Sequence, residues 1–341
     1  MKLFDKIVWL IRAEFVKRRE LNVLLRLAKT VDLSSTNMAP VMVVIAMPGC
    51  VHLTVCCVAH LPSDRRVVVI SNCCSDAEVE ILCSLGVDVY EAGDFNMPHP
   101  QVIEALLLSG SEPFWLVDHD CFLRDKSFLT EIEDQLRSAN SIGAAVFSEK
   151  CGLGLSSSGF ATYLMCIDPV EVRTIQSRYH AGVKVVTWGK MSRRSRQTLL
   201  QLQVKNGTYP QQWKGYFDTF RLIDALAHHD DRQFIRSQTF DASFHLNDCA
   251  VHLGQTSRVF WPDDLQKKKY AAVGAFGSQL LFERMSVFFP NMNGGRLGQL
   301  PRSSLMRALL IEKEVLSAEE IEYFDSLAND FDNWLIKRFG A

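Results

Sequence analysis

Basic and acidic residues nearly balance in this chain of 341 residues, so it lacks a strong charge of either sign. Its 37 Lys and Arg residues and 39 Asp and Glu residues give a formal net charge of -2. Proteins that bind nucleic acid generally carry a basic surplus, and we therefore expect no nucleic-acid partner. The sequence also lacks a signal-peptide pattern, an internal repeat and a long low-complexity stretch. With a hydrophobic content of 48%, it can bury a large core.

A zinc-type cysteine pattern is missing as well. None of the ten cysteines forms a Cys-x-x-Cys pair. Several of them lie in apolar runs, such as Cys56-Cys57 and Cys166, and adjacent cysteines such as Cys73-Cys74 rarely bridge each other. Reduced, buried thiols predict a cytoplasmic protein.

Residues 38–63 contain no Asp, Glu, Lys or Arg. An uncharged run of this length is long enough for a membrane span. A basic segment precedes the run, so an anchor with its amino terminus in the cytosol is one interpretation. The other is a buried strand followed by a helix, because Pro48-Gly49 interrupts the run and His52 and His60 would otherwise lie in lipid. We favour the second interpretation, because a span would remove Val41–Ala46 from an otherwise regular series of strands.

Strand-like apolar runs alternate with helix-like segments from residue 41 to residue 117. The connections between them are short enough for a compact parallel sheet. The expected strands are Val41–Ala46, Arg66–Asn72, Val87–Tyr90 and Pro113–Val117, and the expected helices are Val51–Leu61, Ala77–Leu85 and Gln101–Leu108. The repeated order predicts an α/β fold with a mainly parallel sheet.

The fourth expected strand ends abruptly in Asp118-His119-Asp120. Residues two apart in an extended chain point the same way, and carboxylate oxygens suit Mn²⁺ or Mg²⁺. Ligands of open α/β sheets bind at the carboxyl ends of the strands. The pattern therefore predicts a divalent metal site at the sheet edge, although Asp-x-Asp also occurs as a solvated turn. His119 is expected to face the opposite side of the strand, where packing is its better interpretation.

The order of these segments resembles the nucleotide-sugar half of the GT-A-type glycosyltransferases, most closely the family-two group, over roughly residues 40–260. Further segments match in order: Ser141–Phe147 as the next strand, Gly159–Pro169 as the strand lining the acceptor side, Tyr216–Leu222 as the start of a helix with an acid, and His252–Gly254 as a late segment over the diphosphate. The resemblance implies a GT-A-like mixed, mainly parallel sheet flanked by helices. It also implies an enzyme that moves a sugar from a nucleotide-diphosphate donor to a hydroxyl acceptor.

The resemblance assigns roles to individual residues. The expected residues of a Mn²⁺ or Mg²⁺ site are Asp118, Asp120 and His252. Asp120 is expected to contact the metal directly, and Asp118 to reach the ribose or assist the metal through water. His252 is expected to supply a nitrogen ligand or a hydrogen bond to the diphosphate. The nucleotide is expected at Pro48, Asn72, Asp76 and Asp118. The family commonly places an aspartate for the base just after the second strand, where this chain has Asn72, with Asp76 a little further on.

Asp218 is the expected catalytic base if the transfer inverts the anomeric centre, because the acceptor hydroxyl must then lose a proton. A retaining transfer does not need it in that role. Asp218 also precedes a helical pattern and would fit a helix N-terminus. His245 competes with His252 for the diphosphate role, and we favour His252 because Gly254 permits a close backbone approach.

Two other functions remain open. A sugar-phosphate nucleotidyltransferase has a similar sheet, but it would carry a Gly-rich cationic loop after the first strand, where this chain has Met47-Pro48-Gly49-Cys50-Val51. A catalytically degenerate binding or assembly subunit is the alternative outside catalysis. The presence of Asp118, Asp120, Asp218 and His252 argues against it.

The two ends of the chain are expected to be helical, which gives units at 1–33, 38–262 and 263–341. The first unit repeats apolar residues at helical spacing, among them Leu3, Ile7, Leu10 and Phe15, and carries the basic residues Lys2, Lys6, Arg12, Lys17, Arg18, Arg19, Arg26 and Lys29. Such a helix packs on the protein or a second copy, or lies on an anionic membrane. Peripheral membrane contact would suit a lipid-linked acceptor, and a saccharide is the other expected acceptor.

Overall fold

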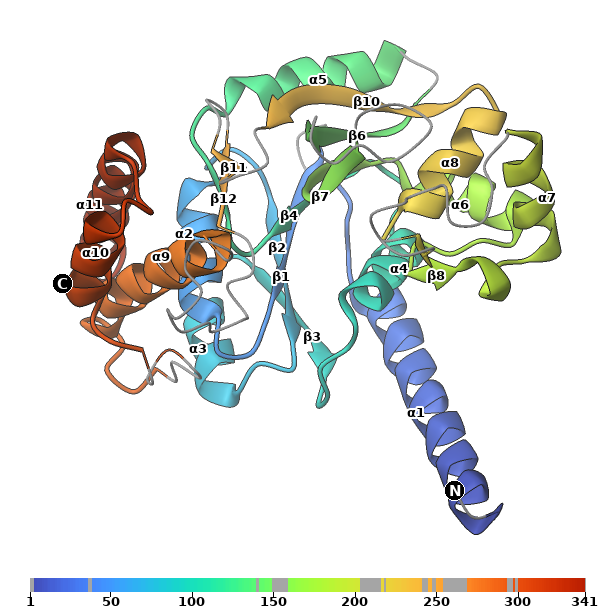
Figure 1. Ribbon diagram of the computed structural model, residues 1–341, viewed down its shortest axis with the longest axis horizontal. Coiled ribbons are helices and arrows are strands. Elements are labelled where there is room, and N and C mark those ends of the chain that lie inside the picture. Colours follow the sequence, from blue (N-terminus) through green and yellow to red (C-terminus); the bar gives the residue numbers. More distant parts are fainter. Residues whose placement is uncertain are drawn as a thin grey trace.

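The computed structural model describes residues 3–35, 39–138, 141–148, 159–202, 216–217, 219–240, 245–246, 250–253, 269–292, 297 and 300–340. A seven-stranded sheet with the order β10-β6-β7-β4-β1-β2-β3 runs through its centre (Figure 1). The strands are β1 (Val41–Ala46), β2 (Val67–Asn72), β3 (Asp88–Gly93), β4 (Phe114–Asp118), β6 (Ser141–Ser148), β7 (Gly159–Ile167) and β10 (Gln233–Phe240).

The sheet is mixed and mainly parallel, as predicted. Strand β1 pairs in parallel with β2 and β4, β2 pairs in parallel with β3, and only β7 runs antiparallel to its neighbours β4 and β6. All residues of β1 and β2 are buried, which is why their sequences are continuous Val- and Ile-rich runs rather than alternating patterns. The carboxyl ends of β1, β2, β3 and β4 consequently meet at one edge of the sheet.

Helices cover both faces of the sheet. Side chains alternate along a strand, so Met42, Val44 and Ala46 of β1 enter one core and Val41, Val43 and Ile45 the other. The first core includes residues of α2 (Val51–His60), α3 (Asp76–Ser84), α5 (Ser127–Ser138), α9 (Lys269–Ser286), α10 (Ser303–Glu312) and α11 (Ala318–Phe339). The second includes residues of α1 (Leu3–Thr30), α4 (His99–Ser109), α6 (Pro169–Tyr179), α7 (Arg193–Gln201) and α8 (Arg221–His229).

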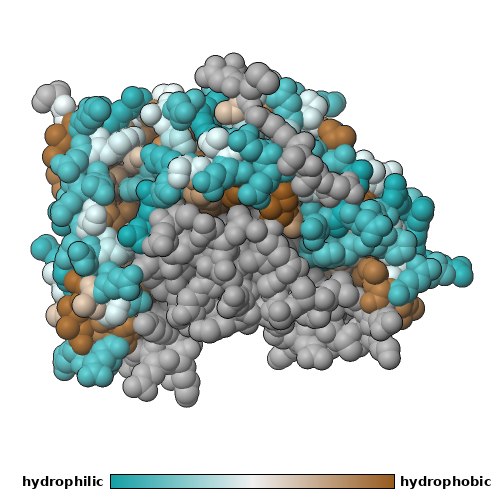
Figure 2. Space-filling model, turned by 90° about the horizontal axis from the view of Figure 1, so that it is seen from above, coloured by the Kyte–Doolittle hydropathy of each residue, from teal (hydrophilic) through white to brown (hydrophobic). Residues whose placement is uncertain are grey.

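The remaining described elements are short. They are β5 (Cys121–Leu123), β11 (His245–Leu246) and β12 (Ala250–His252) in one small sheet, β8 (Val186–Thr187) and β9 (Tyr216–Phe217) in another, and a 3-10 turn at Trp188–Lys190. From above (Figure 2), the described surface is mainly hydrophilic, with hydrophobic patches that include the side of the C-terminal helices on the left. The predicted helical C-terminal region is confirmed, while the predicted domain boundaries stay a prediction.

The uncharged run at residues 38–63 forms core elements. Its first part is β1 in the middle of the sheet, and its second part is α2, most of which is buried against the sheet and α9. Gly49, at φ +75°, makes the turn between them. Among the described residues, no helix combines the length and the apolar character that a membrane crossing requires.

Two predicted boundaries differ from the observed ones at the site edge. Strand β3 continues to Gly93 because it pairs with β2 through a register shift that matches Asn72 with Gly93. Helix α4 begins at His99, two residues before the predicted start, directly after Pro98. Both differences make the β3–α4 connection shorter than predicted, and His99 at its end contacts Asp118 of β4.

A buried ion pair ties α5 to the sheet. Arg65 Nη1 contacts Glu133 Oε1, and the two side chains are only 8% and 6% exposed. Trp115 of β4 donates its indole N–H to the same carboxylate oxygen at 2.6 Å. Glu133 therefore satisfies one buried cation and one buried donor at once.

Candidate metal and nucleotide site

Strand β4 delivers the first predicted ligand to the sheet edge. Asp118 is its last residue, opposite Ile45 of β1, and its side chain is 24% exposed. The chain then turns into β5, and Asp120 in this turn is only 4% exposed. The apolar run of β4 is buried because it is a central strand, and its two acids follow at the point where the strand reaches the edge.

Strand β12 brings His252 to the two aspartates. It pairs antiparallel with β5, with His252 opposite Cys121, and the backbone N–H of Leu253 donates to the carbonyl oxygen of Asp120 at 3.0 Å. A short sheet between segments far apart in the chain therefore fixes the histidine beside the Asp-x-Asp turn.

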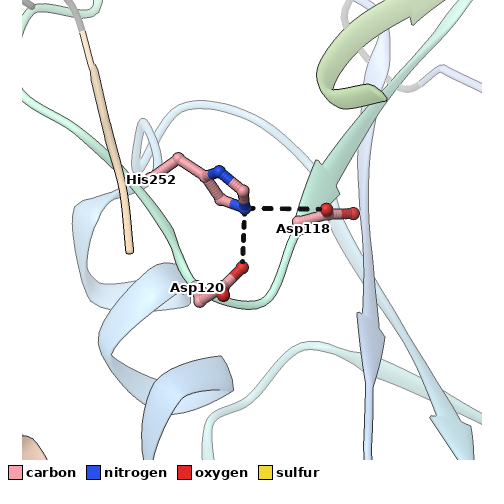
Figure 3. Close-up of side chains that lie close together, drawn as sticks. All are labelled: Asp118, Asp120 and His252. Atoms are coloured by element: carbon pink, nitrogen blue, oxygen red, sulfur yellow. Dashed lines mark ion pairs between the residues drawn. The ribbon is translucent and has the colours of Figure 1, made fainter. Parts of the chain in front are cut away.

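The three side chains converge (Figure 3). His252 Nε2 lies 3.2 Å from Asp120 Oδ1 and 3.9 Å from Asp118 Oδ2, and one ligand atom from each residue lies within 4.8 Å of the others. Two ligand atoms about 2.1 Å from one octahedral ion are separated by roughly 3.0 to 4.2 Å. Both His252 distances fall in that range, so the donor set of two carboxylates and one imidazole fits a divalent cation. Their role as ligands stays a prediction.

The electrostatics of the cluster follow from its burial and its charges. Burial lowers the pKa of His252, but the charge and hydrogen bond of Asp120 together with the charge of Asp118 outweigh burial and raise this pKa above its ordinary value. Burial first, and then the charge of Asp120, raises the pKa of Cys50 to about 12. The same causes hold the pKa of Cys57 well above its ordinary value. These thiols stay protonated at neutral pH and are poor metal ligands.

Two further residues contact the cluster, and neither was predicted from the sequence. The ring of Tyr163 on β7 stacks on the His252 ring, with centroids 4.1 Å apart and planes within 11°. His99, the first residue of α4, places its Nε2 3.5 Å from Asp118 Oδ1. The carboxylate of Asp118 thus has His252 on one oxygen and His99 on the other. The only sequence signal for His99 was its position before an apolar helical pattern, which is too weak to assign a role.

The predicted nucleotide-binding residues lie at the same sheet edge in different environments. Pro48 is exposed in the β1–α2 turn, and Asp76 is exposed in the first turn of α3. Asn72 is fully buried at the end of β2, where its side-chain amide bonds Asn96 and the backbone of Met97. Contact of Pro48, Asn72 and Asp76 with a nucleotide stays a prediction.

The loops beside Pro48 and Asp76 are tied together by Glu78. Its Oε1 accepts the backbone N–H of Gly49 at 2.7 Å, and its Oε2 accepts the backbone N–H and hydroxyl of Ser75 at 2.8 and 2.9 Å. This carboxylate is 2% exposed and joins the β1–α2 turn to the N-terminus of α3. The two turns therefore form one braced unit beside the aspartates.

The sequence also suggested roles for Asp218, His245 and His119. The predicted base Asp218 lies outside the described residues, between Phe217 and Thr219, so its role stays a prediction. The backbone of His245 pairs with His252 across β11 and β12, but its side chain is outside the described part. His119 interacts with His52 of α2, whose pKa is lowered to about 3 by burial and then by His119. It is not part of the cluster formed by its two neighbours.

Comparison with known proteins supports the predicted class. Residues 20–172, somewhat less than half of the chain, match a family model described as the StrH glycosyltransferase N-terminal domain. This segment contains β1 to β4 with Asp118 and Asp120, and it confirms the predicted resemblance to the glycosyltransferases. This part of the chain is thus similar to a glycosyltransferase domain, and the observed mixed, mainly parallel sheet agrees with the predicted GT-A-like fold.

Two other comparisons add no detail. A solved structure of the mannosyltransferase PcManGT from Pyrobaculum calidifontis, in complex with GDP-Man and Mn2+, matches 96% of this chain and 97% of its own, at 11% identity and a TM-score of 0.35. A TM-score this low is too small to transfer the donor or the metal of that enzyme to this chain. No curated protein matches the chain.

Proposed function

We propose that this protein is a glycosyltransferase that binds a nucleotide-diphosphate sugar at the carboxyl edge of β1, β2 and β4 and transfers the sugar to a hydroxyl acceptor. The observation that carries the proposal is the convergence of Asp118, Asp120 and His252 within 4.8 Å. Divalent cations bound to such residues stabilise the negative charge that grows on a leaving diphosphate. The nitrogen ligand in the set favours Mn²⁺ over Mg²⁺, since Mg²⁺ prefers oxygen ligands only.

The residues of the chain have separate tasks in this proposal. Asp120 is nearly inaccessible and its backbone carbonyl is hydrogen-bonded by Leu253 N–H, which suits a direct ligand. Asp118 is more exposed and lies toward His99, which suits a group that meets the ribose as well as the metal. Asp218 remains the proposed base for an inverting transfer, because an acceptor hydroxyl must lose its proton there. A saccharide or a lipid-linked saccharide is the proposed acceptor.

The proposal predicts that nucleoside diphosphates raise the melting temperature of the protein only when Mn²⁺ is present. The expected shift is several degrees, since ligand at 100 times its Kd adds about 2.7 kcal/mol of stability. Thermal denaturation with each nucleoside diphosphate, with Mn²⁺ or with EDTA, measures it, and release of free sugar from the stabilising donor tests catalysis. Stabilisation by nucleoside triphosphates and sugar phosphates instead would indicate a nucleotidyltransferase. Stabilisation without any donor hydrolysis would indicate a binding subunit.

Helix α1 is the proposed membrane contact. Val23 and Leu27 near its C-terminal end are buried against the body of the protein, whereas the first part of the helix projects away from it (Figure 1). On the projecting helix, Leu21 is 53% and Leu25 is 43% exposed, four residues apart on one face. Exposed Lys17 and Arg18 lie nearby. Because basic residues outnumber acidic ones in this helix, an anionic lipid surface suits it better than the like-charged helix of a second copy.

We expect the protein to sediment with vesicles that contain anionic phospholipid and to remain in solution with purely zwitterionic vesicles. Replacing Lys17 and Arg18 by glutamine should weaken this binding roughly 30-fold, since each basic residue near the surface contributes about 1 kcal/mol. The matched control is Lys184→Gln with Lys190→Gln, which removes two exposed charges elsewhere. Equal binding of both double variants would contradict the assignment. The cytoplasmic location and a homo-oligomeric state stay predictions.

A further inference from the structure

The buried amide of Asn72 has only one orientation that satisfies its neighbours. The backbone N–H of Met97 donates to Asn72 Oδ1 at 2.9 Å, and the Met97 carbonyl accepts from Asn72 Nδ2 at 2.9 Å. A backbone N–H cannot accept and a carbonyl cannot donate, so the oxygen and nitrogen of Asn72 cannot be exchanged. Asn72 therefore holds the β3–α4 connection through two hydrogen bonds to the backbone of Met97.

The orientation of Asn72 fixes the orientation of Asn96. The second hydrogen of Asn72 Nδ2 points to the side chain of Asn96, at 2.9 Å from its Oδ1. Because that contact needs an acceptor, the oxygen of Asn96 faces inward and its NH₂ group faces outward. Asn96 is an exposed residue, and no hydrogen bond of its Nδ2 is found among the described residues. The protein thus presents a fixed pair of donors at this position.

These donors lie on the connection that reaches the metal-ligand cluster. Asn72 Nδ2 is 3.5 Å from Met47 Sδ in the β1–α2 connection, and three residues after Asn96 the chain contacts Asp118 through His99. Three residues span at most about 11 Å, a separation comparable to that between the base and the distal phosphate of a nucleoside diphosphate. A nucleotide with its diphosphate at Asp118 and Asp120 therefore has its base within reach of Asn96.

We propose that Asn96 is the residue that selects the donor nucleotide, and that it selects a base with a carbonyl oxygen at the position where adenine and cytosine carry an amino group. This inference rests on the proposed function. The outward NH₂ group donates to O4 of uracil or O6 of guanine, but it meets another donor in cytosine N4 or adenine N6. Asn72, whose amide is committed to Asn96 and Met97, acts as a positioning residue that holds the reading group in one orientation.

The variant Asn96→Asp changes the group that would contact the base and keeps the hydrogen bond that Asn96 accepts from Asn72. A carboxylate keeps one oxygen for the hydrogen bond from Asn72 and replaces only the outward NH₂ by an acceptor oxygen. The experiment measures Kd by calorimetry, with Mn²⁺, for two matched pairs: UDP against CDP and GDP against ADP. In the unaltered protein we expect the diphosphate with the carbonyl base to bind roughly tenfold more tightly in at least one pair. This is about the effect of gaining one hydrogen bond with the carbonyl base, where the amino base leaves the Asn96 donor unpaired. In Asn96→Asp the preference within that pair should reverse.

The ratio of the two Kd values within a pair is insensitive to the added negative charge, because that charge weakens the binding of both diphosphates alike. Asn96→Ala should reduce the ratio toward one without reversing it, and Asn333→Asp on α11 is the control for the same chemical change at a remote exposed site. An unchanged ratio in Asn96→Asp, in a protein that still binds diphosphates with Mn²⁺, would overturn the role of Asn96 alone. A protein that binds none of the four diphosphates would overturn the proposed function and this inference with it.

Discussion

Replacing Asp120 by asparagine is expected to lower kcat/KM for donor hydrolysis and sugar transfer by about 10³-fold, the usual effect of removing one electrostatic contact to a developing negative charge. Asp120 and His252 lie 3.2 Å apart, and the carboxylate is almost completely buried. Asparagine keeps the shape of the side chain but removes its charge and one strong metal-binding oxygen. The backbone contact between Leu253 and the carbonyl of residue 120 does not involve the side chain, so the fold should persist.

Steady-state kinetics at saturating Mn²⁺, together with calorimetric titration of Mn²⁺, measure this effect. Asp64→Asn is the matched control, because Asp64 is an exposed aspartate in the α2–β2 connection, at the amino-terminal end of β2. The control should keep full activity, and EDTA followed by Mn²⁺ should abolish and restore the activity of the unaltered protein. If Asp120→Asn retained both its activity and its affinity for Mn²⁺, the metal-site assignment would be wrong.

Replacing Glu133 by leucine is expected to lower the free energy of unfolding by about 3–5 kcal/mol, because removing one partner of a buried ion pair leaves the other charge uncompensated. Here Arg65 would lose its carboxylate, and the indole N–H of Trp115 would lose its acceptor at the same time. Urea denaturation followed by tryptophan fluorescence measures the change. Glu131→Leu, at an exposed position on the same helix, should change stability by less than about 0.5 kcal/mol.

A double variant shows whether the stability is lost because Arg65 is unpaired or because leucine packs poorly at position 133. The double variant Arg65→Met, Glu133→Leu replaces the whole pair with apolar groups, a change that is often close to neutral. We expect it to recover most of the stability lost by Glu133→Leu. If the double variant were as unstable as the single one, packing around α5 rather than an unpaired arginine would explain the loss.

The sequence predicted the local elements that need only neighbouring residues. Val41–Ala46 forms β1 with the predicted bounds, because a short apolar run rich in β-branched residues favours a strand that is buried on both faces. Helix α11 begins with a capping box, in which the backbone N–H of Glu320 donates to Ser317 Oγ, and the order Ser317-Ala318-Glu319-Glu320 is a local signal for it. Such signals act over a few residues, so they are readable without knowledge of the fold.

The sequence was less informative where pairing between distant segments sets the geometry. The end of β3 was predicted too early, since Glu91 and Gly93 look like a turn but pair with β2. His99 contacts Asp118 and Tyr163 stacks on His252, yet neither residue belongs to a sequence motif that could have revealed its contact. The hydrogen bonds between the Asn72 amide and Met97 in the β3–α4 connection could not be predicted from the sequence either, because the two residues lie on separate segments.

The sequence alone determined that two carboxylates stand two residues apart at the end of an apolar strand-like run, because the length of the run and the alternation of side chains are local properties. Only the tertiary structure decided that His252 joins them, since this depends on the pairing of β12 with β5, and that Asn96 turns its NH₂ group outward, since this depends on Asn72 and Met97. Hydrogen bonds between segments far apart in the chain are made only once the sheet has formed. Their partners are therefore chosen by the fold and not by neighbouring residues.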